Sequence, residues 1–206
     1  LIDANTDAHL WAENYDRELT AANIFAIQSE VATAIAAALK ATLTADEKTR
    51  LNATPTQNLE AWEAYQLGKQ RMARRTSEAL AEAEGFFREA LELDPAFALA
   101  HVGLADVLRM QHEYSGVPLE SALAQSEPAV ARALALDANL AEAWASAAAI
   151  EKAKQQLGRS ESMFQRAIGL NPNFATARHW YSLLLLDSGR FDESLAQIEL
   201  AVALDP

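Results

Sequence analysis

Apolar residues recur along this chain at helical spacing, and one long amphipathic segment stands before a series of similar segments. Within residues 23–40, apolar side chains three or four positions apart predict a helix capped by Asn23; they are Ile24, Ile27, Val31, Ile35 and Leu39. The sequence TADE at 44–47 has the pattern of a capping box and predicts a short second helix. Residues 52–56, NATPT, predict a linker into the segments that follow.

A longer period becomes visible when four phrases are aligned: ALELDPAFALA (90–100), ALALDANLAEA (133–143), AIGLNPNFATA (167–177) and AVALDP (201–206). Their first alanines are 43, 34 and 34 residues apart, so the first gap is one 34-residue unit with nine inserted residues. The same register aligns three further columns of residues. These are Ala83, Ser126, Ser160 and Ser194; Phe87, Val130, Phe164 and Ile198; and Pro95, Ala138, Pro172 and Pro206.

Each unit is predicted to contain two helices. In the third unit they are residues 140–156 and 160–170, joined by a turn at 157–159. Gly158 and Gly189 are expected to end the first helix of their units, and the residue before each Pro to end the second. Small residues in the first helices allow the second helix to pack closely; they are Gly68, Ala105, Ala148 and Ser182. Because a two-helix unit cannot bury its own apolar face, the units are expected to stack into an all-α solenoid.

The repeat departs from its own pattern in four places. Ala138 replaces the closing Pro, and the first unit has about three extra residues, expected in its turn. The nine-residue insertion, HEYSGVPLE at 112–120, is either a binding loop or a tolerated insertion. Pro128 falls inside a predicted helix, so a kink or break is expected near 125–128, with Ser126 capping the remainder.

The Leu-Asp-Pro phrases, the small residues and the buried aromatic column resemble the tetratricopeptide repeat over about residues 58–206. The resemblance implies a right-handed α-solenoid of four two-helix repeats, at about 58–95, 96–138, 139–172 and 173–206. It also implies a protein–protein interaction module.

The segment before the repeats does not follow this period. Residues 1–18 are predicted to form a β-hairpin, the remnant of an upstream α/β domain, and residues 19–57 to form connecting or capping helices. This segment, followed by helical repeats, resembles a bacterial arrangement in which a similar segment and tetratricopeptide repeats stand behind a signalling domain. The resemblance is carried by the phrases LIDA, HLWAENYDR and IFAIQSEVATAIAAAL. In that family the front domain is a class III adenylate/guanylate cyclase, a winged-helix transcription regulator or, less often, a protein kinase. The resemblance implies a regulatory role. Both ends are interpreted as cuts in a longer protein, so the sequence predicts neither export nor its absence.

Composition narrows the function further. The net charge of −12 argues against nucleic-acid binding by this segment, since phosphate contacts need clustered Lys and Arg. The sequence contains no run of about 18 apolar residues that would predict a membrane span. Its lack of cysteine fits a reducing compartment, so a cytoplasmic location is expected. With four scattered histidines and no Gly-x-Ser-x-Gly or phosphate-loop motif, no catalytic residue, metal or cofactor is predicted.

The remaining candidate is the concave groove lined by the first helices. The register places seven residues toward it: Trp62, Tyr65, Lys69, Arg109, Lys152, His179 and Leu183. This mixture suits a peptide with acidic groups, and the upstream effector domain is one candidate partner. Alternatively, the 23–40 helix covers Trp62 and Tyr65 and the cations are merely exposed. The groove is also compatible with a small peptide or metabolite, and the Lys/Asn signature of chaperone-tail clamps is absent.

Assembly is a separate expectation. Repeat arrays normally end in a helix with a polar outer face, whereas the last predicted helix pair here has apolar residues on its outer side; they are Leu183, Leu186, Leu195 and Ile198. Such a surface, or the hairpin edge, predicts a homodimer.

Overall fold

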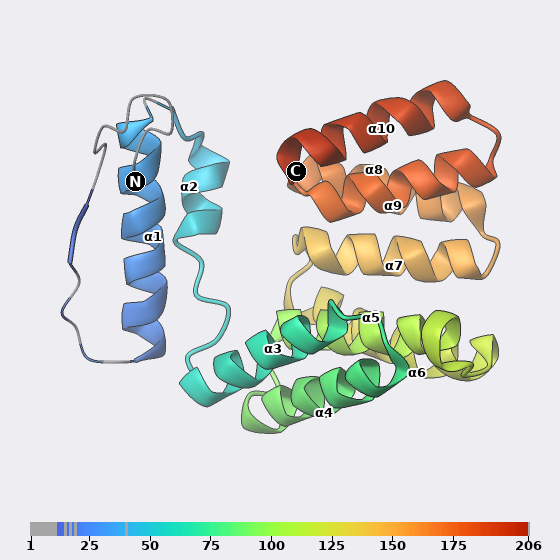
Figure 1. Ribbon diagram of the computed structural model, residues 1–206, viewed down its shortest axis with the longest axis horizontal. Helices are drawn as coiled ribbons and strands as arrows, with labels where there is room; N and C mark the ends of the chain where they lie inside the picture. Colours follow the sequence, from blue (N-terminus) through green and yellow to red (C-terminus); the bar gives the residue numbers. More distant parts are fainter. Residues whose placement is uncertain (1–11, 15, 17, 19, 40, 206) are drawn as a thin grey trace. The chain divides into compact units, whose positions relative to one another are not determined.

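The computed structural model describes residues 12–14, 16, 18, 20–39 and 41–205. This part of the chain contains ten α-helices and no strand, and none of the described helices is long and apolar enough to span a membrane. Most of the hairpin predicted at 1–18 lies outside the described residues, and 12–14, 16 and 18 form no strand, so the structure does not support it. The chain divides into two compact units, Leu1–Trp62 and Glu63–Pro206 (Figure 1).

The first unit contains the two helices that were predicted before the repeats. Helix α1 spans Ala21–Ala38, and its cap is Thr20 rather than Asn23, because the Thr20 hydroxyl accepts the backbone N–H of Asn23 at 3.2 Å. Helix α2, Ala45–Leu51, begins with the predicted capping box. The two helices are joined by a hydrogen bond that the Ser29 hydroxyl donates to the Asn52 side chain at 2.6 Å. Helix α3, Leu59–Met72, begins at the end of this unit.

The second unit is a stack of antiparallel helix pairs, as the solenoid prediction requires (Figure 1). After α3 these helices are α4 (Ser77–Leu93), α5 (Ala98–Ser115), α6 (Leu119–Leu136), α7 (Ala141–Ala153), α8 (Leu157–Leu170), α9 (Ala175–Asp187) and α10 (Phe191–Leu204). The first helices of successive repeats also contact one another, α5 with α7 and α7 with α9. They therefore form a continuous inner layer.

The junctions between repeats use the same hydrogen bonds each time. At Asp94, Asp137 and Asn171 the side-chain oxygen accepts the N–H of the residue two positions later, at 2.9, 2.8 and 3.2 Å. Six residues after Pro95, Ala138 and Pro172, a side chain folds back onto that residue's carbonyl oxygen; these side chains are His101, Trp144 and Arg178, at 3.1, 2.9 and 3.0 Å. The junction uses the carbonyl rather than the proline ring, which explains why Ala138 is accommodated.

The aromatic column forms the core between helices, as the register predicts. Phe87 and Phe164 are completely buried, and Val130 nearly so, whereas Ile198 is half-buried. Gly68 is required beside Phe87, because a Cβ there would lie 2.8 Å from the ring. Serines of the preceding column lock the helix pairs, since Ser160 donates to the Ala148 carbonyl and Ser194 to the Ser182 carbonyl, both at 2.8 Å.

Two predicted helix boundaries need correction. Gly189, at φ 74, follows α9 as expected, but Gly158 lies inside α8. Gln155, at φ 61, takes the left-handed position after α7 instead. In the first repeat the extra residues lengthen α4, which has 17 residues against 14 in α8, rather than its turn.

The nine-residue insertion is helix rather than loop. Helix α5 has 18 residues against 13 in α7, and α6 has 18 against 14 in α8, which together absorb all nine residues. Only Gly116, Val117 and Pro118 connect the two lengthened helices. The predicted break at Pro128 is also wrong, because α6 runs through it without interruption. Pro128 and Ala124, whose carbonyl lacks its usual partner, are both exposed, so water can solvate that oxygen.

Candidate functional site

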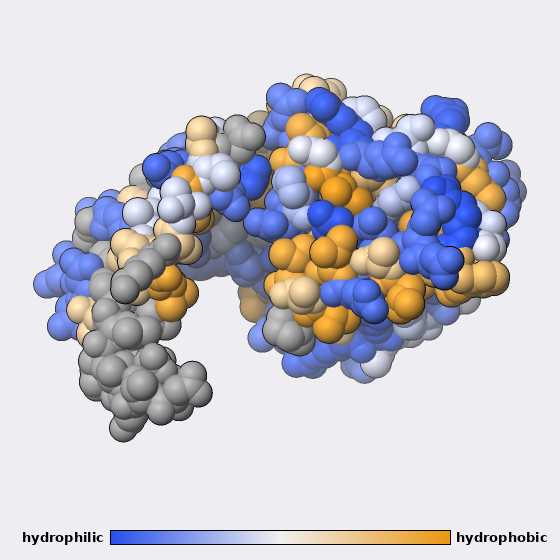
Figure 2. Space-filling view, turned by 90° about the horizontal axis from the view of Figure 1, so that it is seen from above, coloured by the Kyte–Doolittle hydropathy of each residue, from blue (hydrophilic) through white to orange (hydrophobic). Residues whose placement is uncertain are grey.

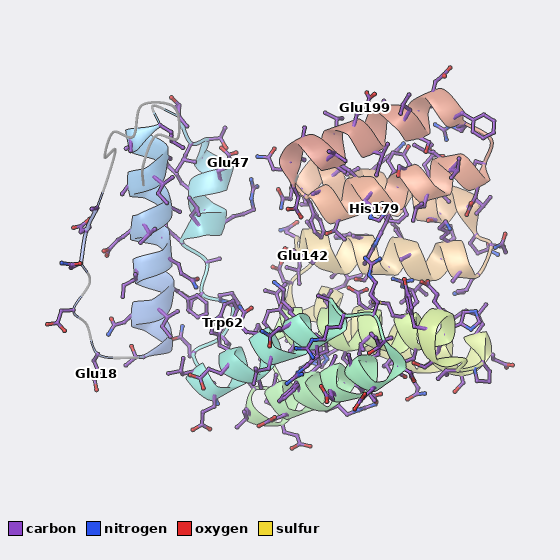
Figure 3. The ribbon with its side chains drawn as sticks, viewed as in Figure 1. Glu18, Glu47, Trp62, Glu142, His179 and Glu199 are labelled. Carbon is purple, nitrogen blue, oxygen red and sulfur yellow. The ribbon has the colours of Figure 1, made fainter. Side chains whose placement is uncertain are left out.

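The inner layer of the second unit borders two adjoining cavities of about 540 and 630 Å³, called here the first and second cavities. The first is lined by α5, α7 and α9 and by the turns at Arg75 and Gln155. The second is lined by the end of α3 and the turn after it, by Met110 of α5, and by α9 and α10. Arg75, Met110, His179 and Trp180 line both, so the two cavities meet there. Figure 3 labels His179 on α9.

Five of the seven groove residues predicted from the sequence line these cavities. Arg109, Lys152 and Leu183 line the first cavity, Lys69 lines the second, and His179 lines both. Their role in binding stays a prediction.

Trp62 and Tyr65 line neither cavity. The Trp62 ring packs edge to face on Phe25 of α1, at 4.7 Å between centroids, so the alternative in which the 23–40 helix covers it holds for Trp62. Tyr65 is buried against the rings of Phe87 and Phe97, at 5.9 and 5.0 Å. Burial, with a smaller effect from nearby carboxylates, raises the pKa of the Tyr65 hydroxyl well above its ordinary value. Tyr65 is therefore a core residue rather than part of the groove surface.

The cavity lining is predominantly cationic, although the chain carries a net charge of −12. The first cavity presents Arg75, Arg109 and Lys152, with two histidines, against the carboxylate of Glu113. Met110, Trp180 and Leu183 add apolar surface. The lining therefore suits a ligand that combines negative charge with apolar groups.

Arg109 joins the second repeat to the fourth. Its guanidinium lies 5.1 Å from the centroid of the Trp180 ring and donates to Glu113 at 2.8 Å. Only 13% of its side chain is exposed. Lys152 similarly forms an ion pair with Asp187 at 2.6 Å. Both cations thus hold the repeats together as well as facing the cavity, so removing either would disturb the fold.

A partly buried carboxylate lies on the same helix as Arg109. Asp106 of α5 accepts a hydrogen bond from the Ser146 hydroxyl of α7 at 2.7 Å. Desolvation raises the pKa of Asp106 from 3.8 to about 6, although Arg109 and the Ser146 hydrogen bond both act in the opposite direction. The sequence showed this residue only as an acid within an apolar run, Ala105-Asp106-Val107, and its partner could not be inferred.

Sequence reasoning missed several lining residues. Met110 and Trp180 lie next to the predicted Arg109 and His179, so a wider helical face would have included them. Arg75 and Gln155 lie in turns, where the backbone conformation sets the direction of the side chain. Among the described residues, no group of three or more His, Asp or Glu is placed to hold a metal ion.

Comparisons with known proteins agree with this architecture. No family model matches the chain. A protein of Rhizobium meliloti (strain 1021) named "Putative adenylate cyclase 3" is 37% identical over 105 residues, which is 51% of this chain and 18% of that protein. This chain therefore spans less than a fifth of that relative's length.

Two solved structures share the fold. TTC0263, a tetratricopeptide-repeat protein of Thermus thermophilus, superposes with a TM-score of 0.60 at 16% identity, over 90% of this chain and 88% of that one. The first repeat domain of Spaghetti (RPAP3), bound to the HSP90 peptide SRMEEVD, superposes with a TM-score of 0.51 at 17% identity, over 63% of this chain and 96% of that one. The stacked helix pairs of this chain thus have the tetratricopeptide-repeat fold.

Proposed function

We propose that the second unit is a protein-interaction module whose two cavities hold a peptide segment of a partner protein, with carboxylates among its groups. The observation that carries the proposal is the cationic lining of joined cavities on an acidic chain. The RPAP3 repeat domain, which shares the fold, was solved with a peptide containing two glutamates and an aspartate. The segment itself performs no catalysis in this proposal.

The partner belongs to a cytoplasmic bacterial signalling system, and a class III cyclase is the favoured effector domain. The support is the 37% identity to the Rhizobium protein named as an adenylate cyclase, together with the resemblance of residues 1–39 and the repeats to such proteins. The effector domain of the same polypeptide is one candidate ligand. A winged-helix transcription regulator is the second candidate effector.

A small-ligand sensor is the alternative of a different class. Cavities of about 540 and 630 Å³ lie within the range that holds small organic ligands. Binding of a small acid in preference to any peptide would favour this alternative.

An array of seven-residue peptides tests the interaction proposal. Each peptide is synthesised twice, once with Asp and Glu and once with Asn and Gln at the same positions. The purified protein should retain a subset of the carboxylate peptides and bind their carboxamide counterparts more weakly. Failure to retain any peptide would refute the proposal.

The link to a cyclase has its own test. The gene sequence before Leu1 should encode a cyclase domain. The nucleotide cyclase activity of the full-length protein should also change when Lys69, an exposed cation of the second cavity, is replaced by Glu. Glu78→Lys, outside both cavities, is the control. A winged-helix domain before Leu1 would favour the second candidate, and an unrelated domain would contradict both.

The homodimer also remains a proposal. Helices α9 and α10 expose apolar residues that line neither cavity: Leu186 and Leu195, as predicted, and also Phe191 and Leu200. Of the other residues predicted on this outer side, Leu183 lines the first cavity and Ile198, half-buried, lines the second. Apolar patches interrupt the hydrophilic surface of this unit in Figure 2. A second copy would cover the same surface on each partner and close a symmetric pair.

A further inference from the structure

Each turn between the two helices of a repeat contains a residue in the left-handed conformation. In the second and fourth repeats this residue is glycine, Gly116 at φ 71 and Gly189 at φ 74. In the first and third repeats it is Arg75 at φ 52 and Gln155 at φ 61. Glycine adopts this conformation freely, whereas any residue with a Cβ is strained there. Two turns thus carry long polar side chains where two others carry the unstrained residue.

Both strained residues line the first cavity, although they come from repeats that are not adjacent. Among the described residues, Arg75 and Gln155 are also the two non-glycine residues that have a positive φ. Arg75 lines the second cavity as well, so it stands where the two cavities meet. Strained backbone that is kept at the wall of a cavity points to a role for the side chain it presents.

Arg75 differs from the other arginine and the lysine of the first cavity in its charge balance. Arg109 is paired with Glu113, and Lys152 with Asp187. Among the described residues, no carboxylate pairs with Arg75, and its side chain is exposed. Its charge is therefore available to a ligand, while the charges of Arg109 and Lys152 are largely neutralised within the protein.

We infer that Arg75, assisted by Gln155, binds an oxyanion group of the segment held in the cavities and so determines which ligands are accepted. The inference rests on the proposed function and specifies the chemistry of its ligand. A guanidinium can donate two parallel hydrogen bonds to a carboxylate or a phosphate. The amide of Gln155, which lines the same cavity, can donate another. The anion could be an Asp or Glu side chain, a carboxyl terminus or a phosphoserine.

The test compares Arg75→Gly with wild-type protein. Because glycine favours the conformation at this position, the variant should unfold at the same or a higher temperature than wild type. Its affinity for the carboxylate peptides selected on the array should fall about tenfold or more, since charge-assisted hydrogen bonds are lost. Its affinity for the carboxamide counterparts should stay the same. Gln155→Gly should weaken binding by about threefold, as expected for a neutral hydrogen bond.

Two further variants separate this subsite from general charge effects. Arg74→Ala removes the same charge from the same turn, but Arg74 lines neither cavity, so binding should persist. Arg75→Lys keeps the charge but loses the paired hydrogen bonds of the guanidinium, so it should retain only part of the preference for carboxylates. Peptides with free and amidated carboxyl termini, and with phosphoserine in place of Glu, show which anion is held.

The outcomes are distinguishable. If wild type binds carboxylate peptides and Arg75→Gly retains the full preference over carboxamides, the subsite inference is wrong and the proposed function stands. An equal loss in Arg74→Ala would also overturn the inference, because charge at a distance would explain it. If wild type binds no peptide, the proposed function and the inference both fail.

Discussion

Gly103 allows the first two repeats to pack, and its replacement by Ala should destabilise the protein. Phe87 of α4 lies completely buried between Gly68 of α3 and Gly103 of α5. A Cβ at position 103 would lie 2.4 Å from Cε1 of the Phe87 ring, and one at position 68 would lie 2.8 Å from the same atom. Tyr65 also packs on this ring, at 5.9 Å, which restricts the movement of Phe87 away from an added Cβ.

The expected change in the free energy of unfolding follows from two opposing effects. Replacing Gly by Ala inside a helix stabilises it by about 1 kcal/mol. Overpacking a closed core costs about 1–3 kcal/mol, and a contact this short favours the upper part of that range. Gly103→Ala should therefore lower the free energy of unfolding by about 1–2 kcal/mol, which corresponds to several degrees in the melting temperature.

Gly85→Ala is the matched control, because Gly85 lies in α4 with nothing within 4 Å of the added Cβ. This variant should be more stable than wild type by roughly 0.5–1 kcal/mol, and urea denaturation should separate the two variants by about 2–3 kcal/mol. Gly103→Ala should also cost less when Phe87 is replaced by Leu, because the smaller side chain relieves the contact. If Gly103→Ala were as stable as Gly85→Ala, the packing argument would be refuted.

Three further predictions concern burial, pH and assembly. Phe164→Ala should lower the free energy of unfolding by roughly 3–5 kcal/mol, because its ring is completely buried, whereas Phe191→Ala, 66% exposed, should have little effect in the same urea titration. Because the pKa of Asp106 is raised in the folded state, its contribution to stability is present below pH 3.8 and is lost as the pH rises through about 6. Asp106→Asn should therefore raise the unfolding midpoint at pH 7.5 but not at pH 3.5. An equal gain at both pH values would contradict this. Light scattering at micromolar concentration should show a dimer that Leu195→Glu dissociates, and a monomeric wild type would contradict the proposed assembly.

The repeat architecture could be predicted from the sequence because its causes are local. Helical spacing, the small residue opposite Phe164 and the residue before each closing Pro all act within one 34-residue unit or between adjacent units. The helix pairs and the burial of Phe87, Val130 and Phe164 were therefore predicted correctly, whereas Ile198 is only half-buried. The insertion at 112–120 was misjudged because Gly116 and Pro118 indicate a loop, whereas the lengthened α5 and α6 support each other by packing along their whole length.

The binding surface was only partly predictable. The inward direction of Arg109, Lys152 and His179 follows from helical register, which local sequence determines. The pairing of Arg109 with Trp180 and the meeting of the two cavities at Arg75 depend on how far each repeat is rotated against the next. That rotation accumulates over several interfaces, and small differences in side-chain volume at each one set its value. Sequence alone thus determined which helix faces turn inward, and only the tertiary structure decided which side chains meet across the groove.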